Sequence, residues 1–296
     1  MRVFITGGTG YVGSAIVEVL VSRGHEVTGL SRSPEKDAVL ARLGALPLRG
    51  SLADLPRLSD QVAAHDAMIH CGMDYGLGPP SDRGAVEALL AAARSVGSPR
   101  HVVYTSGVWV LGETTAPAGE DASTARPAAA VAWRPAHEKL VLDATYRNLV
   151  TSVVRPGMVW GEKRGLFIPF LESATRDGAA AHVGPGENRW PPVHRKDLAA
   201  LYALVVEKRA AGLFHGVDGS SPRVKEIARA LSEAAGAKGK THAVPLEEAR
   251  QAYGPMADAL AMDQVVVAPR AAGLGWKPER PSFPGAAAVA LAEWKR

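Results

Sequence analysis

The chain has 296 residues, of which 47% are hydrophobic and 22% charged, and its net charge at pH 7 is +4. This composition excludes a disordered, collagen-like or coiled-coil chain and is typical of one or two globular domains. A single cysteine, Cys71, excludes a disulfide framework and a cysteine-ligated zinc site, and no metal is expected. There is no polybasic tract and no apolar run of the roughly 20 residues that a membrane span needs. We therefore expect a cytoplasmic protein that binds neither nucleic acid nor membrane, with monomer and homodimer both open.

The chain begins with the pattern of a strand, a glycine-rich loop, a helix and a second strand. Residues 3–5 are a short apolar run, residues 12–20 have apolar side chains at helical spacing, and residues 25–30 again favour a strand. In the loop, Gly8, Gly10 and Gly13 fit the spacing G-x-G-x-x-G, while Gly7, Gly10 and Gly13 fit G-x-x-G-x-x-G. In this context such glycines let the backbone approach the phosphates of a dinucleotide at a helix N-terminus.

The end of the second predicted strand bears on the choice of cofactor. An NAD site usually carries an acidic residue here, whereas this chain has Arg32 and no acid until Glu35. A guanidinium pairs well with a 2′-phosphate, so the sequence favours NADP(H) over NAD(H). The alternative is that Arg32 is a solvated surface residue.

Strands and helices continue to alternate beyond this point. Further strands are expected at residues 46–49, 67–71, 101–105 and 151–155, with a helix over residues 86–96. This alternation predicts the α/β class, with a doubly wound parallel sheet of the Rossmann type. After residue 160 it weakens, and helices are expected over residues 196–208 and, capped by Ser221, from residue 224 to 236. We expect a dinucleotide-binding domain over residues 1–160 and a smaller substrate lobe over residues 161–296, with an interleaved boundary.

Several motifs in chain order resemble the extended short-chain dehydrogenase/reductase superfamily, which includes epimerase/dehydratase-like proteins. They are the glycine loop at residues 6–13, the fourth strand at 67–72, the segments 104–112, 154–161 and 193–199, and Leu-Gly-Trp-Lys-Pro at 274–278. The resemblance covers residue 2 to about residue 280 and implies a Rossmann fold with a bound dinucleotide. Its usual catalytic set is a Tyr four residues before a Lys, with a Ser or Thr nearby.

The chain departs from that catalytic set. Lys139 is the one lysine in the expected helix, and Pro135 occupies the position of the tyrosine. Gly107 takes the usual Ser/Thr position, with Ser106 beside it. The candidate catalytic residues are therefore Ser106 to hold a carbonyl, Lys139 to bind the ribose, and His137 to replace the tyrosine as proton donor. The alternative for His137 is an exposed residue at a helix start.

Other candidate site residues follow from their places at strand ends and loops. Those expected at the cofactor are Gly7, Gly10, Tyr11, Val12, Gly13, Arg32, Ser51, Leu52, Cys71, Lys139, Pro156 and Val159. Those expected at the substrate are Asp74, Tyr75, Trp109, Trp133, Trp190 and His194. Because tryptophans line apolar ligand sites, they favour a flat, apolar substrate. The alternative interpretation of these tryptophans is that they pack between the two lobes. Trp160 has the same two interpretations.

Three functions remain open at this point. The first is an NAD(P)H-dependent oxidoreductase acting on a small, hydrophobic carbonyl or alcohol. The second is a nucleotide-sugar epimerase or dehydratase, which would need a basic pyrophosphate site with Arg189 and Arg195 as candidates. The third is a dinucleotide-sensing regulator without catalysis, which the missing tyrosine would permit.

Overall fold

The computed structural model describes all 296 residues and divides them into two compact units. Unit 1 comprises Met1–Ser106, Trp133–Arg155 and Ala199–Phe214, and unit 2 comprises Gly107–Ala132, Pro156–Leu198 and His215–Arg296. The sequence predicted a dinucleotide-binding domain over residues 1–160 and a smaller lobe over residues 161–296, with an interleaved boundary between them. In the structure the two units interleave from residue 107 onward. None of the helices is long and apolar enough to cross a membrane.

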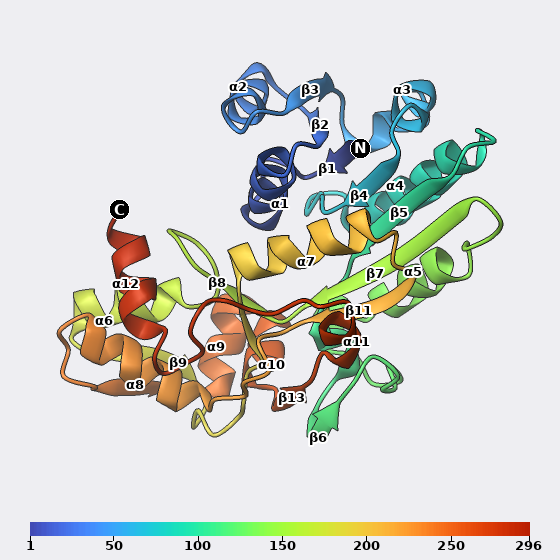
Figure 1. Ribbon diagram of the computed structural model, residues 1–296. Helices are drawn as coiled ribbons and strands as arrows, with labels where there is room; N and C mark the ends of the chain where they lie inside the picture. The colour runs from blue at the N-terminus through green and yellow to red at the C-terminus, as the bar shows by residue number, and fades with distance from the viewer. The chain divides into compact units, whose positions relative to one another are not determined.

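A seven-stranded sheet is the frame of unit 1 (Figure 1). Its strands lie in the order β11-β7-β5-β4-β1-β2-β3, and the pairings from β7 to β3 are all parallel. The strands are β1 (Arg2–Thr6), β2 (Glu26–Ser31), β3 (Leu46–Arg49), β4 (Ala67–His70), β5 (Arg100–Thr105), β7 (Leu149–Pro156) and β11 (Gly212–Gly216). The strand order reverses between β1 and β4, which is where ligands bind in open parallel sheets.

Helices cover both faces of this sheet. One face buries Phe4, Met68 and Tyr104 against α3, α4 and α5. On the other face, α1 and α7 lie side by side, joined by the ion pair of Arg23 and Glu207 at 2.9 Å. The helices of this unit are α1 (Tyr11–Ser22), α2 (Pro34–Arg42), α3 (Ser59–Ala63), α4 (Gly78–Arg94), α5 (Arg134–Leu142) and most of α7 (Arg195–Glu207). The doubly wound Rossmann architecture predicted from the alternation is confirmed.

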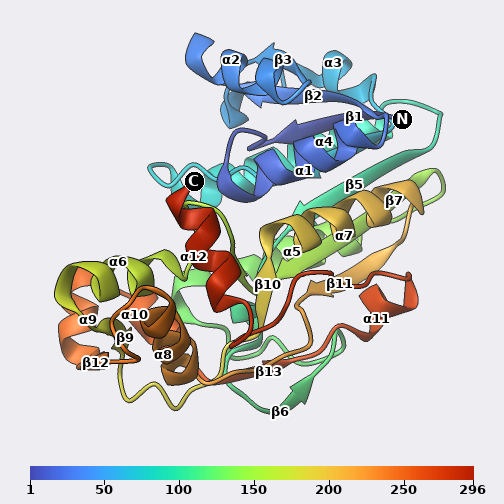
Figure 2. The ribbon, with the colours of Figure 1, turned by 60° about the vertical axis from the view of Figure 1, so that its left-hand side comes forward.

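Unit 2 has three two-stranded parallel sheets and a core of its own. Figure 2 shows α6, α8, α9 and α10 gathered around β9 and β12. The strands pair as β10-β8, β12-β9 and β13-β6. They are β6 (Thr114–Ala118), β8 (Met158–Trp160), β9 (Ala180–Val183), β10 (Pro192–His194), β12 (Thr241–Val244) and β13 (Gln264–Val266). The helices are α6 (Ile168–Asp177), α8 (Val224–Ala234), α9 (Leu246–Tyr253), α10 (Met256–Ala261), α11 (Pro269–Gly273) and α12 (Ala287–Lys295).

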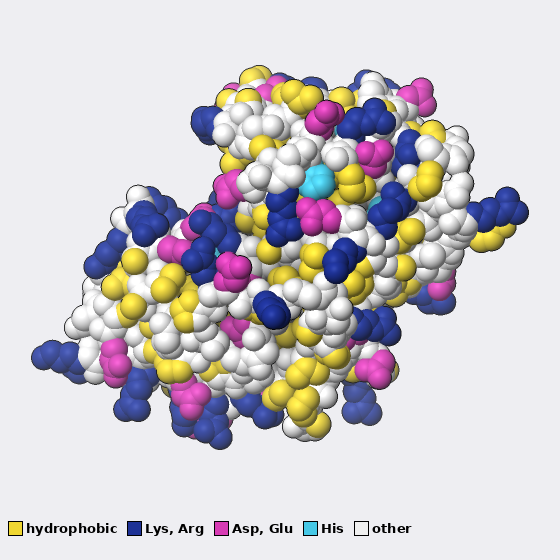
Figure 3. Space-filling view, viewed as in Figure 1, with side chains coloured by type: hydrophobic (Ala, Val, Ile, Leu, Met, Phe, Trp, Pro, Cys, Tyr) yellow, Lys and Arg dark blue, Asp and Glu magenta, His cyan; other side chains and the backbone are white.

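One helix start and one helix cap differ from the prediction. The helix expected over residues 86–96 begins eight residues earlier, at Gly78, because two prolines in its first turn are compatible with a helix start. The helix expected from residue 224 does begin at Val224, but its N-cap is Arg223 and not Ser221. The backbone N–H of Arg223 donates a hydrogen bond to the Glu226 carboxylate. The first correction matters for the site, because it places Asp82 inside α4. Figure 3 shows acidic and basic side chains interspersed over one face, as the mild net charge predicts.

Candidate active site

The glycine loop between β1 and α1 has a geometry that side chains would block. Gly7 has φ +71°, and a Cβ there would lie 2.6 Å from the carbonyl oxygen of Cys71. A Cβ on Gly13 would lie 2.1 Å from the carbonyl oxygen of Gly7, whose oxygen also accepts the Gly10 N–H at 2.8 Å. Gly8 instead backs onto core side chains. The spacing Gly7, Gly10, Gly13 is therefore the one that the backbone geometry requires.

This loop fits a dinucleotide. Helix α1 has Gly10 at its N-cap, no side-chain cap and no acidic residue in its first turn. No carboxylate of the first turn therefore opposes an anion at the positive end of the helix dipole. Tyr11 and Val12 form the first turn beside the loop. We conclude that the loop can hold the pyrophosphate of a nicotinamide dinucleotide, which would supply hydride chemistry when bound.

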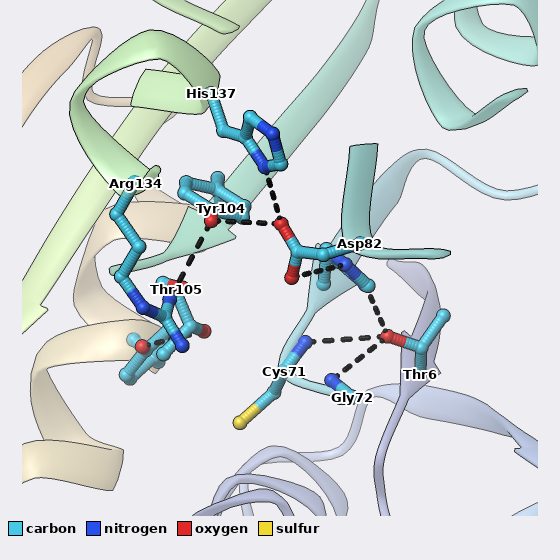
Figure 4. A network of polar contacts seen from close by, with 10 residues as sticks. Thr6, Cys71, Gly72, Asp82, Tyr104, Thr105, Arg134 and His137 are labelled. Carbon is cyan, nitrogen blue, oxygen red and sulfur yellow. Dashed lines mark hydrogen bonds and ion pairs between the residues drawn. The ribbon is translucent and has the colours of Figure 1, made fainter. Parts of the chain in front are cut away.

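Thr6 fastens the end of β1 to the end of β4. Its Oγ1 accepts the N–H groups of Cys71 at 3.3 Å and Gly72 at 3.1 Å, and it contacts His70 Nδ1 at 2.7 Å (Figure 4). Cys71 is half-buried, and burial raises the pKa of its thiol to about 11. At neutral pH the residue is therefore an uncharged neighbour of the loop and not a nucleophile.

Asp82 of α4 is the centre of a buried polar network on the face covered by α4 and α5. Its Oδ2 accepts hydrogen bonds from Tyr104 at 2.9 Å and from His137 Nδ1 at 2.7 Å, and its Oδ1 lies 3.3 Å from His70 Nε2 (Figure 4). Burial alone would raise the pKa of Asp82, but the hydrogen bonds from His137 and His70 hold it well below its usual range. Burial raises the pKa of Tyr104 above its ordinary value. The carboxylate therefore remains charged and fixes three side chains.

The three catalytic candidates are not brought together. Ser106 follows β5 directly, and its Oγ is buried without a hydrogen-bond partner. His137 is buried rather than exposed, and it is held by Asp82. Lys139 points into solvent, with 76% of its side chain exposed and its Nζ paired with Asp143 at 2.7 Å. Lys139 is thus paired with Asp143 on its own helix, and its role as a cofactor ligand stays a prediction.

Sequence reasoning overlooked Arg134, which begins α5. Its Nη1 donates to the carbonyl oxygen of Thr105 at 2.7 Å and lies 3.5 Å from the hydroxyl of Tyr104 (Figure 4). Trp133, predicted at the substrate, is half-buried; the Arg134 guanidinium carbon lies 4.5 Å from its ring centroid and His137 packs against it edge-on. The sequence did contain an indication of Arg134, because it lies in the same helix as Lys139 and also carries a permanent positive charge.

The end of β2 places Arg32 opposite an acid. The Nη1 atom of Arg32 lies 3.2 Å from Asp74 Oδ2, and 67% of the Arg32 side chain is exposed. Asp74 Oδ1 also accepts the N–H groups of Gly76 and Leu77, which shapes the loop after β4. Tyr75 in that loop is 91% exposed. Ser51 forms a capping box with Asp54, and Leu52 follows it in a 3-10 turn.

The unit 2 candidates are mostly core residues, which corrects the expectation that they line a substrate site. Trp190 is buried beside Phe167 and Phe170, and its Nε1 donates to the Leu260 carbonyl at 3.0 Å. Trp160 is buried in the same cluster. Trp109 is half-buried against it.

His194 of unit 2 is also a packed residue. It is buried against the Trp160 ring, with Nε2 3.1 Å from the Glu293 carboxylate, and it accepts the Lys196 N–H through Nδ1. Burial lowers its pKa, against the opposing effect of Glu293. Pro156 is buried at the end of β7, and Val159 is half-buried in β8.

The two arginines expected at a sugar-nucleotide pyrophosphate are engaged by carboxylates. Arg189 binds Asp263 through Nε at 2.9 Å and Nη2 at 2.6 Å. Arg195 is buried and paired with Glu162. Neither guanidinium is therefore an open anion site.

A glycine cradle at the switch point of a parallel sheet defines the Rossmann class of dinucleotide-binding proteins. The chain belongs to the NAD dependent epimerase/dehydratase family, whose model matches residues 3–215. The predicted resemblance to this atypical branch of the short-chain dehydrogenase/reductase superfamily is thereby confirmed.

Individual relatives are similar over most of the chain. A Stigmatella aurantiaca 4-hydroxy-2-methyl-3-oxo-4-farnesyl-3,4-dihydroquinoline-1-oxide ketoreductase is 30% identical, covering 85% of this chain and 78% of its own. A Stenotrophomonas maltophilia 2-alkyl-3-oxoalkanoate reductase is 31% identical, covering 72% and 67%. Human SDR39U1, an epimerase family protein crystallised with NADPH, shares the fold with a TM-score of 0.77 at 24% identity, and the match covers 100% of both chains.

Proposed function

We propose that the protein is an NADP(H)-dependent oxidoreductase that reduces a small, hydrophobic ketone or oxidises the corresponding alcohol. The observation that carries this proposal is the unpartnered hydroxyl of Ser106, buried directly after β5 in the unit that holds the glycine cradle. A buried hydroxyl without a partner costs free energy, and the carbonyl oxygen of a substrate would satisfy it.

The relatives support the same chemistry. Both curated names quoted above describe reduction of a ketone, and both substrates carry apolar chains. Arg189 and Arg195 are paired with Asp263 and Glu162, which makes a pyrophosphate site for a sugar nucleotide less favoured. Arg32 supports NADP(H), because its exposed guanidinium follows β2, where the adenosine half of a dinucleotide is expected.

Within this proposal the chain's own groups orient and protonate. Ser106 Oγ donates a hydrogen bond to the carbonyl oxygen and relays a proton to it from water. His137 cannot release its Nδ1 proton without leaving the buried Asp82 carboxylate short of a donor, so it acts as a positioning residue. A dinucleotide held at Gly7, Gly10 and Gly13 would supply the hydride chemistry, and the chain's own groups would orient the carbonyl for it.

The test is NADPH oxidation with a panel of 2-alkyl-3-oxo acids and cyclic ketones. We expect turnover with at least one of them, and Ser106→Ala should lower kcat by about a hundredfold while leaving the Kd for NADPH unchanged. Ser22→Ala, on the exposed end of α1, is the matched control and should retain full activity. NADPH binding with no turnover across the panel would favour the regulator instead.

A further inference from the structure

The order of strands in unit 1 determines which residues lie on each side of the glycine loop at the carboxyl edge of the sheet. The glycine loop follows β1, Arg32 follows β2 on one side, and Cys71 and Thr105 mark the ends of β4 and β5 on the other. Neighbouring strands are about 4.8 Å apart, so β5 lies roughly 10 Å from β1. A dinucleotide with its pyrophosphate at the loop would place its adenosine half on the β2 side and its nicotinamide half on the β4 and β5 side.

Arg134 stands at the β5 end of this edge. It donates through Nη1 to the last carbonyl of β5, and Tyr202 donates to the hydroxyl of the same residue, Thr105, at 2.8 Å. Both of its hydrogen bonds leave from Nη1, so the other edge of the guanidinium, Nε and Nη2, has no acceptor in the chain. A planar pair of donors of this kind matches two adjacent oxygen atoms.

Lys139 recedes from the same edge. Helix α5 starts beside the end of β5, and the following strand β7 starts opposite Arg100, the first residue of β5. The helix therefore runs from the carboxyl edge of the sheet to its amino edge. Lys139, five residues after Arg134, lies about 7.5 Å further along that axis. Its ion pair with Asp143 directs it still further along the helix.

We propose that Arg134, and not Lys139, is the cationic residue that binds the nicotinamide-side ribose of the dinucleotide, donating from Nε and Nη2 to its two hydroxyl oxygens. This inference rests on the proposed function. The bonds to Thr105 and the stacking on Trp133 fix the guanidinium before the ligand arrives, which reduces the entropy lost on binding.

Two ligands separate the halves of the cofactor. NADPH contains both halves, whereas 2′,5′-ADP contains only the adenosine half with its 2′-phosphate. Calorimetric titration of Arg134→Ala should show the Kd for NADPH raised about tenfold and the Kd for 2′,5′-ADP unchanged. Arg134→Lys, which keeps the charge without the planar fork, should lie in between. Arg83→Ala, at an exposed ion pair on α4, is the matched control and should behave as wild type.

Each outcome decides the question. An unchanged NADPH affinity in Arg134→Ala, or a loss in Lys139→Ala alone, would overturn the assignment while wild-type binding of NADPH leaves the proposed function standing. An equal loss for both ligands would also overturn it, because it would show damage to the whole site. A wild-type protein that binds neither ligand would instead overturn the proposed function, and the assignment with it.

Discussion

The carbonyl oxygen of Gly7 occupies the space that a side chain on Gly13 would need, with a separation of 2.1 Å from the added Cβ. The loop and the first turn of α1 are thus in direct backbone contact. No rotation of a side chain can relieve this clash, because the obstructing atom belongs to the backbone.

Gly13→Ala is therefore expected to displace the helix start from the loop. We expect the affinity for NADPH to fall by about tenfold or more and the free energy of unfolding to fall by about 1–3 kcal/mol. Calorimetric titration and urea unfolding measure the two effects. Gly84→Ala is the control, because a Cβ there meets nothing within 4 Å in α4. Equal NADPH affinity in the two variants would contradict this account of the loop.

The ion pair of Arg32 and Asp74 should set the cofactor preference. Arg32→Ala is expected to weaken NADPH by about tenfold and to leave NADH nearly unchanged, since only NADPH carries a 2′-phosphate. Asp74→Asn removes a negative charge beside that phosphate and should strengthen NADPH by about threefold at low salt, with the gain shrinking as salt is added. Titrations with both cofactors at two salt concentrations test this. A parallel change for NADH would remove Arg32 from the 2′-phosphate.

His101 should make the protein sensitive to mild acid. It is buried in β5, its Nε2 donates to Ser152 Oγ at 2.7 Å, and its Nδ1 has no partner. Burial, and secondarily the charge of Arg209, lowers its pKa to about 3. The folded state therefore favours the neutral ring. The resulting stability is complete above the unfolded pKa of about 6.5 and is lost as the pH falls from there toward 3.

Urea unfolding at pH 7 and pH 4.5 measures this loss. Between these values the wild type should lose about 2 kcal/mol more than His101→Gln, which keeps a donor but cannot titrate in this range. His242→Gln, at an exposed position in β12, should follow the wild type. Identical pH profiles for wild type and His101→Gln would show that the buried ring does not set the acid limit.

Neutralising the buried Asp82 carboxylate should be costly for stability. Asp82→Asn leaves three buried donors facing one amide, and we expect the free energy of unfolding to fall by about 3 kcal/mol at pH 7. Because the folded-state pKa is depressed, the wild-type advantage is present above the unfolded pKa of about 4 and narrows below it. Asp143→Asn, at an exposed pair, is the control. A cost that persists unchanged under acid conditions would show that packing, not charge, is responsible.

Local patterns in the sequence predicted the frame well. The strands at β1 to β5 and β7 are short apolar runs, and the fixed spacing of Gly7, Gly10 and Gly13 has a direct backbone reason. The start of α4 was missed because Gly78 and the prolines that follow it are poor helix formers outside a first turn. Asp82 thereby escaped notice, although it organises four elements.

Side-chain roles that depend on distant segments could not be predicted. Lys139 matched a spacing, but only the direction of α5 shows that it leaves the carboxyl edge of the sheet. Trp160 and Trp190 lie near glycines and prolines, which suggested loops around a ligand. Trp160 instead packs against Phe283, and Trp190 packs against Phe167, within one buried cluster. Phe167 and Phe283 are more than 100 positions apart in the sequence, and no local pattern encodes such contacts.

The interleaving of the two units has a consequence for synthesis of the chain on the ribosome. The sheet of unit 1 is completed by β11, so its β7 edge stays unpaired until residue 212 and beyond have left the exit tunnel. A nascent chain halted near residue 160 would expose that edge, and its sheet would lack the cover of α7. Exposed strand edges can pair with other chains. Both α7 and β11 must therefore be synthesised before the N-terminal half is protected from aggregation.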